Sequence, residues 1–162
     1  MRPVVPTSAR RGGFTLIEVT VVLMLSAIGL SYAFLSFGGY FQRVSAERAA
    51  QVFAQDLTVA RSWSVRSREP VVIRFFESSL WYQVEAQSSG TEVLRRRFGV
   101  NADIDLTAAT LEFPGDSVVF DLRGIADLSG VGGSLGTATF SSGAVSYTVS
   151  FNSMGASKID RT

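Results

Sequence analysis

Apolar residues form an almost unbroken run over residues 14–37, and the only charged residue within it is Glu18. A helix of this length, rising about 1.5 Å per residue, spans about 36 Å, which is enough to cross a lipid bilayer. Arg10 and Arg11 precede the run, and no basic residue follows until Arg43. Because basic residues stay on the cytoplasmic side of a membrane span, the pattern predicts a transmembrane helix with the N-terminus in the cytoplasm.

Residues 38–69 continue the helical pattern in an amphipathic form. From Tyr40 to Ser67, apolar side chains recur every three or four residues while charged side chains take the other faces. The pattern ends at Glu69, because a residue that precedes proline avoids the helical region. The apolar face is expected to contain Phe41, Val44, Arg48 or Ala49, Val52, Phe53, Leu57, Ala60 and Trp63, and the other faces Arg43, Glu47, Gln51 and Asp56. The two stretches together predict one helix from Phe14 to about Ser67.

After Pro70 the period of the apolar positions changes from about 3.6 residues to two, which is typical of strands. Val71–Phe76 and Leu80–Glu85 flank a short connection and predict a hairpin. Further strands are expected at Glu92–Phe98, Thr110–Phe113, Ser117–Asp121, Gly136–Ser141, Ala144–Phe151 and Ser157–Ile159. The sequence therefore predicts an α+β fold, in which a long N-terminal helix packs on antiparallel sheets of a β-rich domain over 70–162.

The composition narrows the range of functions, because the chain contains neither cysteine nor histidine. Disulfides, thiolate nucleophiles, the commonest metal ligand and the commonest general base at neutral pH are therefore missing. We expect a protein that is not an enzyme and uses no cofactor. Removal of residues 1–13 would take away three of the 15 basic residues and leave 12 against 14 acidic ones, a net charge of −2. Such a charge gives little reason to bind nucleic acid.

Two ordinary interpretations of the N-terminal segment leave Glu18 unexplained. A secretory signal peptide could be cleaved after Ala33, but its apolar part is usually only about 7–15 residues long and carries no acid. A simple membrane anchor explains the length of the run. An ionised acid, however, costs about 2–3 kcal/mol at the bilayer centre and usually marks a function.

The stretch from Gly12 to Val19, GGFTLIEV, resembles the class III signal of type IV pilins and type II secretion pseudopilins. The resemblance implies that residues 1–13 are a leader peptide, which a prepilin peptidase removes by cutting between Gly13 and Phe14. It also implies that the same enzyme methylates the amine of Phe14. Glu18 takes the position of the family's conserved acid, so in the filament it would pair with the N-terminal amine of a neighbouring subunit and set the register between subunits.

The strand layout after the helix, with Val118–Gly124 followed by a hairpin and a late glycine at Gly155, resembles the GspH and FimT family of minor pseudopilins. This resemblance implies a pilin-like fold and a structural role in the tip or the priming of a type II secretion pseudopilus. The expected partners are major and minor pseudopilins, the prepilin peptidase and an inner-membrane assembly platform. The chain would cross the inner membrane once, with its C-terminal domain in the periplasm, and would be extracted into the pseudopilus.

Two other functions fit the same pattern. One is a FimT-like minor pilin of a type IV pilus that binds DNA for uptake, and the other is an ordinary signal-anchored periplasmic domain. In the family that this chain resembles, FimT-like members that take up DNA are associated with a basic C-terminal tail after a glycine. Here the tail after Gly155 has only Lys158 and Arg161, with Asp160 between them, which argues against nucleic acid as a partner.

The run from Arg95 to Arg97 is the most concentrated positive charge in the sequence. In a strand, Arg95 and Arg97 would share one face and Arg96 would take the other. These residues are candidates for contact with DNA phosphates, with a secreted cargo or with acids of a neighbouring subunit. A charged edge strand that resists aggregation would show the same pattern.

Four acids, Asp103, Asp105, Asp121 and Asp127, are the candidates for a calcium site. No stretch around them matches an oxygen-rich loop with alternating ligands. Acids at strand ends are commonly turn residues, and we therefore expect no metal site.

Overall fold

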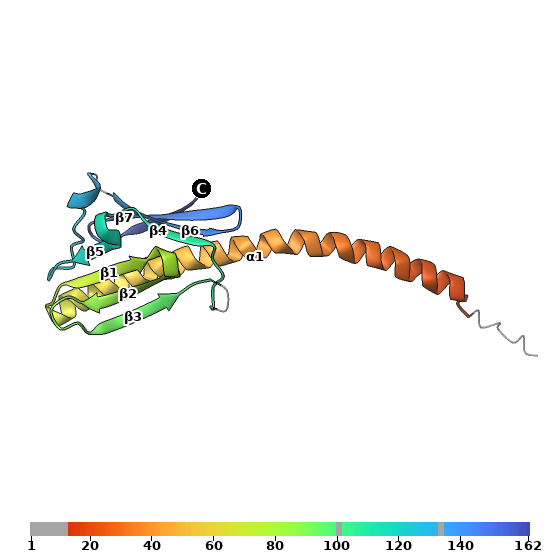
Figure 1. The fold of residues 1–162 in the computed structure, drawn as a ribbon, viewed down its shortest axis with the longest axis horizontal. Helices are drawn as coiled ribbons and strands as arrows, with labels where there is room; N and C mark the ends of the chain where they lie inside the picture. Colours follow the sequence, from red (N-terminus) through yellow and green to blue (C-terminus); the bar gives the residue numbers. More distant parts are fainter. Residues whose placement is uncertain (1–12, 100–101, 133–134) are drawn as a thin grey trace, which may run out of the picture. The chain divides into compact units, whose positions relative to one another are not determined.

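The structure is a computed structural model that describes residues 13–99, 102–132 and 135–162. Helix α1 (Leu16–Ser67) comes first, and within the described residues it is followed by eight strands (Figure 1). The strands are β1 (Val71–Phe76), β2 (Trp81–Ala86), β3 (Glu92–Arg97), β4 (Ala108–Leu111), β5 (Ser117–Phe120), β6 (Leu135–Ser142), β7 (Val145–Asn152) and β8 (Ser157–Arg161). The chain forms two compact units, one before Gly39 and one over Gly39–Thr162.

The strands form two four-stranded antiparallel sheets in the second unit. The first sheet has the order β3-β2-β1-β5 and the second the order β4-β6-β7-β8, so β3 and β8 are both edge strands. Strands β1 and β2 pair along their whole length, from Val71 opposite Ala86 to Phe76 opposite Trp81. The fold class expected from the sequence, a long helix packed on antiparallel sheets, is confirmed.

The core lies where α1 meets both sheets, and Phe53 is at its centre. The Phe53 ring lies 5.4 Å from Phe75 and 5.5 Å from Tyr82 of the first sheet, and 5.4 Å from Phe140 and 6.1 Å from Phe151 of the second. Most of these rings meet edge to face, the arrangement that aromatic pairs prefer. One helical side chain therefore joins both sheets into a single core.

The buried face of α1 differs from the expected one at its N-terminal end. Phe41 and Val44 were expected on the buried face, but their side chains are 64% and 41% exposed. Burial begins at Ala46 and continues along a stripe of small and apolar residues: Ala46, Ala49, Ala50, Phe53, Leu57 and Ala60. Alanines allow the helix to approach the sheets closely, but they add little to a pattern of large apolar residues. The larger residues Phe41 and Val44 dominated the apolar pattern, so the sequence predicted that the buried face of α1 begins about one turn before its observed start.

The strand ends also differ slightly from the expected ones. Strand β2 begins at Trp81, because Leu80 has a positive φ of 50° and closes the turn after β1. Strand β4 lies at Ala108–Leu111, two residues before its expected position. Helix α1 begins at Leu16 instead of Phe14. The last strand, β8, extends to Arg161, beyond the expected end at Ile159.

Replacing Gly136 by alanine should destabilise the second unit. A Cβ atom at Gly136 would lie 2.5 Å from the ring of Phe113 and 2.6 Å from the ring of Phe151, which stack on each other at 5.9 Å between ring centroids. Because overpacking of a filled core typically costs about 1–3 kcal/mol, we expect a loss of this size. Urea unfolding of the detergent-solubilised full chain measures it, since both tryptophans, Trp63 and Trp81, lie in the second unit.

Gly39→Ala is the matched control for Gly136→Ala. Gly39 lies in α1 with no atom within 4 Å of the added Cβ, and alanine is a better helix former than glycine. We therefore expect no loss of stability in the control. Equal unfolding midpoints for the two variants would mean that the rings around Gly136 can move aside.

Candidate functional site

The N-terminal end of α1 places the residues that the sequence linked to processing and assembly. Residues 13–15 are not helical, and the side-chain oxygen of Thr15 accepts a hydrogen bond from the backbone N–H of Glu18 at 3.3 Å. Thr15 is thus the N-cap, and Glu18 is the third helical residue, the spacing of a capping box. Its carboxylate also lies in the first turn, where the helix dipole favours negative charge. The T-x-x-E spacing would have revealed this local role from the sequence.

Gly13 and Phe14 lie just before α1, within the described residues, and Phe14 is almost fully exposed. The remainder of the expected leader, residues 1–12, lies outside the described residues.

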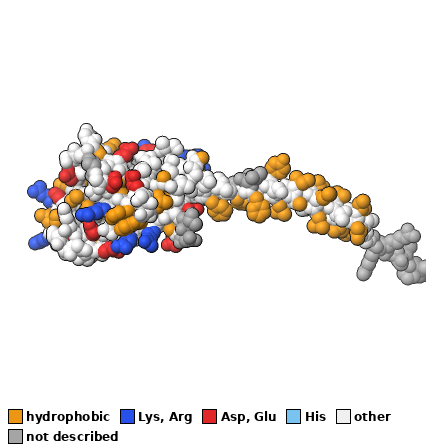
Figure 2. Space-filling model, viewed as in Figure 1, with side chains coloured by type: hydrophobic (Ala, Val, Ile, Leu, Met, Phe, Trp, Pro, Cys, Tyr) orange, Lys and Arg blue, Asp and Glu red, His pale blue; other side chains and the backbone are white. Residues whose placement is uncertain are grey.

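The part of α1 that follows Glu18 exposes apolar side chains on all sides. Its most apolar 18-residue window has a mean hydropathy of 2.0, and none of it is buried, so α1 is long and apolar enough to cross a membrane. Figure 2 shows hydrophobic side chains along this segment on the face in view, with backbone and other side chains between them. Water-soluble proteins rarely expose so long a run of apolar side chains. We infer that lipid or other helices cover it.

Three hydroxyl side chains inside this apolar segment are hydrogen-bonded to the backbone of their own helix. Three hydroxyl groups each donate to a backbone carbonyl about one turn earlier, at 2.7 to 2.9 Å: Thr20 to Ile17, Ser26 to Val22 and Ser31 to Ala27. In hydrocarbon no water is present to take these protons, so such internal bonds remove most of the cost of inserting the hydroxyl groups.

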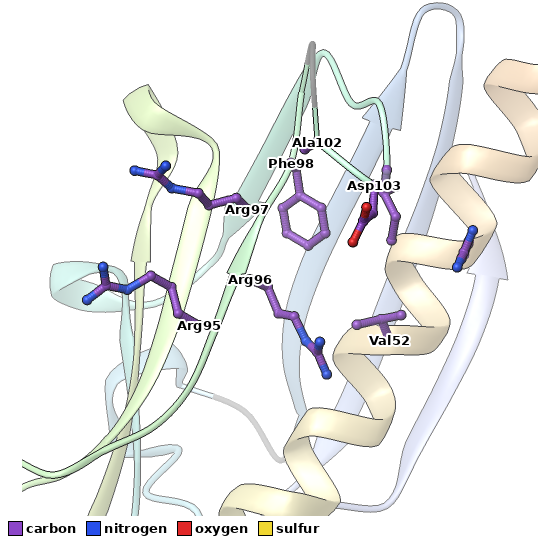
Figure 3. A pocket seen from close by; sticks show the side chains of 9 residues that line it. Val52, Arg95, Arg96, Arg97, Phe98, Ala102 and Asp103 are labelled. Atoms are coloured by element: carbon purple, nitrogen blue, oxygen red, sulfur yellow. The ribbon is translucent and has the colours of Figure 1, made fainter.

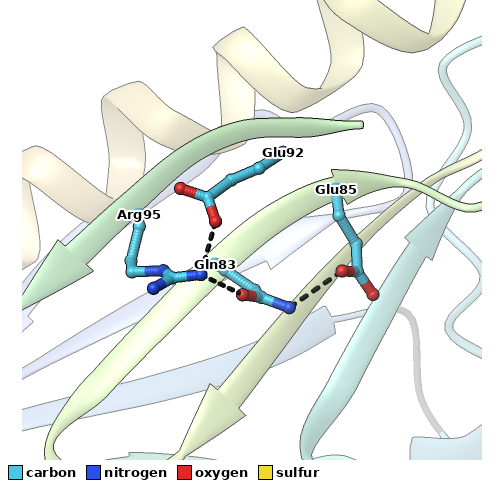
Figure 4. Close-up of polar contacts among 4 residues, drawn as sticks. All are labelled: Gln83, Glu85, Glu92 and Arg95. Atoms are coloured by element: carbon cyan, nitrogen blue, oxygen red, sulfur yellow. Dashed lines mark hydrogen bonds and ion pairs between the residues drawn. The ribbon is translucent and has the colours of Figure 1, made fainter. Parts of the chain in front are cut away.

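The arginine run lies on β3, and the structure gives each of its members a different environment. Arg95 is on the outer face of the first sheet, where its guanidinium lies 4.9 Å from the centroid of the Trp81 ring. It also contacts the carboxylate of Glu92 and donates to Gln83 at 3.3 Å (Figure 4). Gln83 in turn donates to Glu85 at 2.8 Å. Arg95 therefore belongs to a polar network that ties neighbouring strands together.

Arg96 points the opposite way, toward α1 (Figure 3). Its guanidinium donates to both carboxylate oxygens of Asp56, at 2.9 and 3.2 Å, and Asp56 also accepts a hydrogen bond of 2.7 Å from the buried hydroxyl of Tyr82. The bonds to Asp56 raise the pKa of Arg96. Burial, together with the charge of Asp56, raises the pKa of Tyr82 well above its ordinary value. Through Asp56, Arg96 links the edge strand β3 to α1.

Asp56 is a core residue that the sequence placed on a polar face. Its side chain is only 3% exposed, whereas that of Arg96 is 48% exposed. The predicted exposure of Asp56 was wrong. Its charge indicated a solvent-exposed side chain, but its two partners, Tyr82 and Arg96, lie on strands 26 and 40 residues further along the chain.

The two basic residues of the C-terminal strand are not brought together with the arginine run. Lys158 forms an exposed ion pair with Asp160 at 2.8 Å, and Arg161 is exposed at the end of β8. Strand β8 belongs to the second sheet, and Figure 1 shows the C-terminal end well apart from β3. These residues therefore do not join Arg95–Arg97 in one basic patch.

Two of the four acids considered for a metal site, Asp121 and Asp127, accept hydrogen bonds from nearby backbone, and the other two, Asp103 and Asp105, are exposed. Asp121 accepts hydrogen bonds of 2.8 Å from the backbone N–H groups of Arg123 and Ile125. Asp127 accepts one of 3.0 Å from the N–H of Ser129, and hydrogen bonds with this residue lower the pKa of Asp127. Both acids shape turns. In the part of the chain that the structure describes, no three acids come together in a way that could hold a metal ion.

The two glycines of the pseudopilin-like pattern meet the same helical side chain. Gly124 and Gly155 have positive φ angles of 74° and 73°, and a Cβ on either one would face Arg61, at 2.8 and 3.6 Å. The Arg61 guanidinium donates to the carbonyl of Met154 at 2.7 Å. These glycines therefore let two loops dock closely on α1.

Comparisons with known proteins agree with this fold and this N-terminal segment. A family model described as the type II transport protein GspH matches residues 49–155, and one described as the prokaryotic N-terminal methylation motif matches residues 8–34. No curated protein matches the sequence.

Among solved structures, the type IV minor pilin FimU of Pseudomonas aeruginosa is similar to this chain, with 16% identity and a TM-score of 0.54 over 75% of this chain and 92% of FimU. The minor pseudopilin EpsH from the type 2 secretion system of Vibrio cholerae is also similar, with 12% identity and a TM-score of 0.48 over 72% of this chain and 97% of EpsH. The likeness to FimU confirms the pilin-like fold. Because the GspH model covers more than half of the residues, this chain belongs to the GspH family, whose members are minor pseudopilins or minor pilins.

Proposed function

We propose that this chain is a minor pseudopilin of a type II secretion system and acts at the tip or in the priming of a periplasmic pseudopilus. The observation that carries the proposal is the GspH family match over 49–155, together with a methylation motif that ends inside the apolar part of α1. The role is structural. The chain is expected to perform no catalysis and to use no cofactor.

The proposed organisation has four parts. Residues 1–13 are a leader, residues 14–37 a transmembrane helix, residues 38–69 its amphipathic continuation and residues 70–162 a β-rich domain. The apolar surface of α1 and the arginines before it support an inner-membrane position with the N-terminus in the cytoplasm and the domain in the periplasm. Prepilin peptidase, the assembly platform and other major and minor pseudopilins are the proposed partners.

The charge distribution favours protein partners over DNA. Within the arginine run, Arg95 and Arg96 already have acidic partners, and Lys158 in the C-terminal strand is paired with Asp160. DNA binding depends on several basic groups that are free to neutralise phosphates. Too few unpaired basic side chains lie close together in the described part of this chain for the alternative role in DNA uptake.

Gly13→Arg should prevent removal of the leader. The substitution puts a long, charged side chain at the residue whose carbonyl would be cut, so the chain should keep residues 1–13. Wild-type protein from membranes should instead begin at an N-methylated Phe14, which N-terminal sequencing and mass spectrometry will detect. Gly12→Arg adds the same charge one residue earlier and should still be cleaved.

The same strains test the role in secretion. In a deletion strain, wild-type protein should restore export of type II substrates, Gly13→Arg should not, and DNA uptake should be unaffected throughout. A mature chain that begins at Phe34 would support an ordinary signal peptide. Loss of DNA uptake with normal export would support the minor pilin.

A further inference from the structure

A pocket of about 450 Å³ lies between α1 and the edge strand β3 (Figure 3). Arg48 and Val52 line it from the helix, Arg95–Phe98 from the strand and its end, and Ala102–Ile104 from the following loop. Phe98 and Ile104 are buried and Val52 is partly buried, so the pocket has apolar walls beneath a charged rim. We call this feature the β3 pocket.

Strand β3 has one edge without a neighbouring strand, because it is the outermost strand of its sheet. The N–H of Phe98 donates to the carbonyl of Leu80 at 2.8 Å, and Arg96 lies opposite Tyr82 in the same ladder. In an antiparallel pair, the peptide groups of alternate residues face the partner strand. Those of Arg95 and Arg97 therefore face the free edge, where an extended chain can bind them.

The charge of the β3 pocket is only partly compensated. Four arginines line it, with Asp103 as its acidic member. Arg95 is paired with Glu92 and Arg96 with Asp56. For Arg48 and Arg97, the described residues provide no ion pair and no side-chain hydrogen bond. Arg48 lines the pocket from α1, whereas the side chain of Arg97 points from β3 away from α1 (Figure 3). Two guanidinium groups without an acidic partner among the residues described therefore lie on opposite sides of the free strand edge.

We propose that the β3 pocket binds an extended, acidic peptide segment of another subunit. The segment adds to the free edge of β3 through its backbone, and carboxylates on its two faces bind Arg48 on the helix side and Arg97 on the outer side. Backbone pairing provides affinity in this mode of recognition, and side chains in pockets provide specificity. Carboxylates suit the site because guanidinium groups form strong, directional hydrogen bonds with them. The identification of the partner as another pseudopilin rests on the proposed function.

Nucleic acid fits the β3 pocket less well. Residues 39–162 contain 12 of the 15 basic residues and 13 of the 14 acidic ones, so this unit has no excess of positive charge. A nucleic acid needs a row of phosphate contacts along its backbone. Here the two unpaired arginines lie on opposite sides of β3, and only Arg48 is on the side of the apolar pocket. This arrangement suits the alternating side chains of an extended peptide.

In-membrane photo-crosslinking of the full-length chain tests the proposal. A photo-reactive amino acid replaces Asp103, an exposed residue that lines the pocket, in cells that contain the complete secretion system. Mass spectrometry should identify an acidic segment of another pseudopilin as the crosslinked product. Arg48→Gln with Arg97→Gln should lower the crosslinking yield by about tenfold, because both carboxylate contacts are lost.

Arg123→Gln with Arg161→Gln is the matched control, since it removes two exposed arginines outside the pocket. Its crosslinking yield should equal that of the wild type. An equal loss in both double variants would overturn the proposal, as would wild-type crosslinks only to nucleic acid, to lipid or to a second copy of this chain, or the absence of any crosslink.

A second photo-reactive position, at Val22 in the apolar segment, separates this inference from the proposed function. Crosslinks from Val22 to other pseudopilins report assembly through the helices. If they form while those from position 103 do not, the docking site is wrong and the proposed function stands. If neither position gives crosslinks to pseudopilins, both proposals fail.

Discussion

Asp56→Ala will destabilise the second unit by about 1–4 kcal/mol. The change leaves the buried hydroxyl of Tyr82 without its acceptor, and an unsatisfied buried polar group costs about 1–3 kcal/mol. It also breaks the ion pair with Arg96, whose side chain is about half exposed and can turn to water, so this part contributes about 1 kcal/mol at most. The larger share of the loss therefore comes from the tyrosine.

Urea unfolding of the solubilised full chain, followed by tryptophan fluorescence, measures this effect. Glu92→Ala is the control, because it breaks the ion pair with Arg95, in which both side chains are 45% to 49% exposed, and should cost less than about 1 kcal/mol. Asp56→Asn keeps an oxygen that can accept from Tyr82, so its loss should lie between the two. Equal losses for Asp56→Ala and Glu92→Ala would show that the contacts of Asp56 with Tyr82 and Arg96 contribute no more than a surface ion pair.

The periodicity of the sequence was sufficient for the main elements but not for the groups buried between them. A strand can be predicted from alternation within six or eight residues, as in β7, where Tyr147, Val149 and Phe151 are buried in turn. The triad of Asp56, Tyr82 and Arg96 has no such local pattern. Its members become neighbours only when β2 and β3 pack on the helix. Without that information, the charge of Asp56 predicted an exposed position.

The arginine run shows the opposite problem, because residues adjacent in the sequence are not equivalent in the fold. The alternation of side chains between the two faces of β3 was predicted correctly: Arg96 points toward α1, and Arg95 and Arg97 point away from it (Figure 3). The sequence could not show that Glu92 and Trp81 would engage Arg95 while Arg97 stayed unpaired among the described residues. The β3 pocket was missed as well, since it depends on Arg48, which lies nearly fifty residues before the run.

At the N-terminus, two accounts of Glu18 now make different predictions. The family resemblance assigns its carboxylate to a neighbouring subunit, which is a proposal about assembly. The structure adds a local role, because Thr15 and Glu18 have the positions of a capping box. Loss of an N-cap costs about 1 kcal/mol of helix stability, which is small for a helix of 52 residues.

Glu18→Ala should therefore abolish entry into the pseudopilus without harming membrane insertion. Removing an ionisable group from an apolar segment should improve insertion by about 1–2 kcal/mol or leave it unchanged. The variant should be inserted, cleaved and stable. It should nevertheless fail to crosslink to pseudopilin neighbours and should reduce secretion, because the amine of Phe14 in an adjacent subunit loses its counter-charge inside the apolar bundle.

Thr15→Ala separates the two roles, because it removes the capping hydroxyl and keeps the carboxylate. If Glu18 acts between subunits, Thr15→Ala should assemble and support secretion like the wild type, while Glu18→Ala should not. If Glu18 acts only at the helix end, the two variants should behave alike, with a small effect on both readouts. Normal crosslinking and secretion by Glu18→Ala, measured in the same membranes as the wild type, would contradict the pairing with Phe14. The acid would then serve the first turn of its own helix, where the dipole and the N-cap already stabilise it.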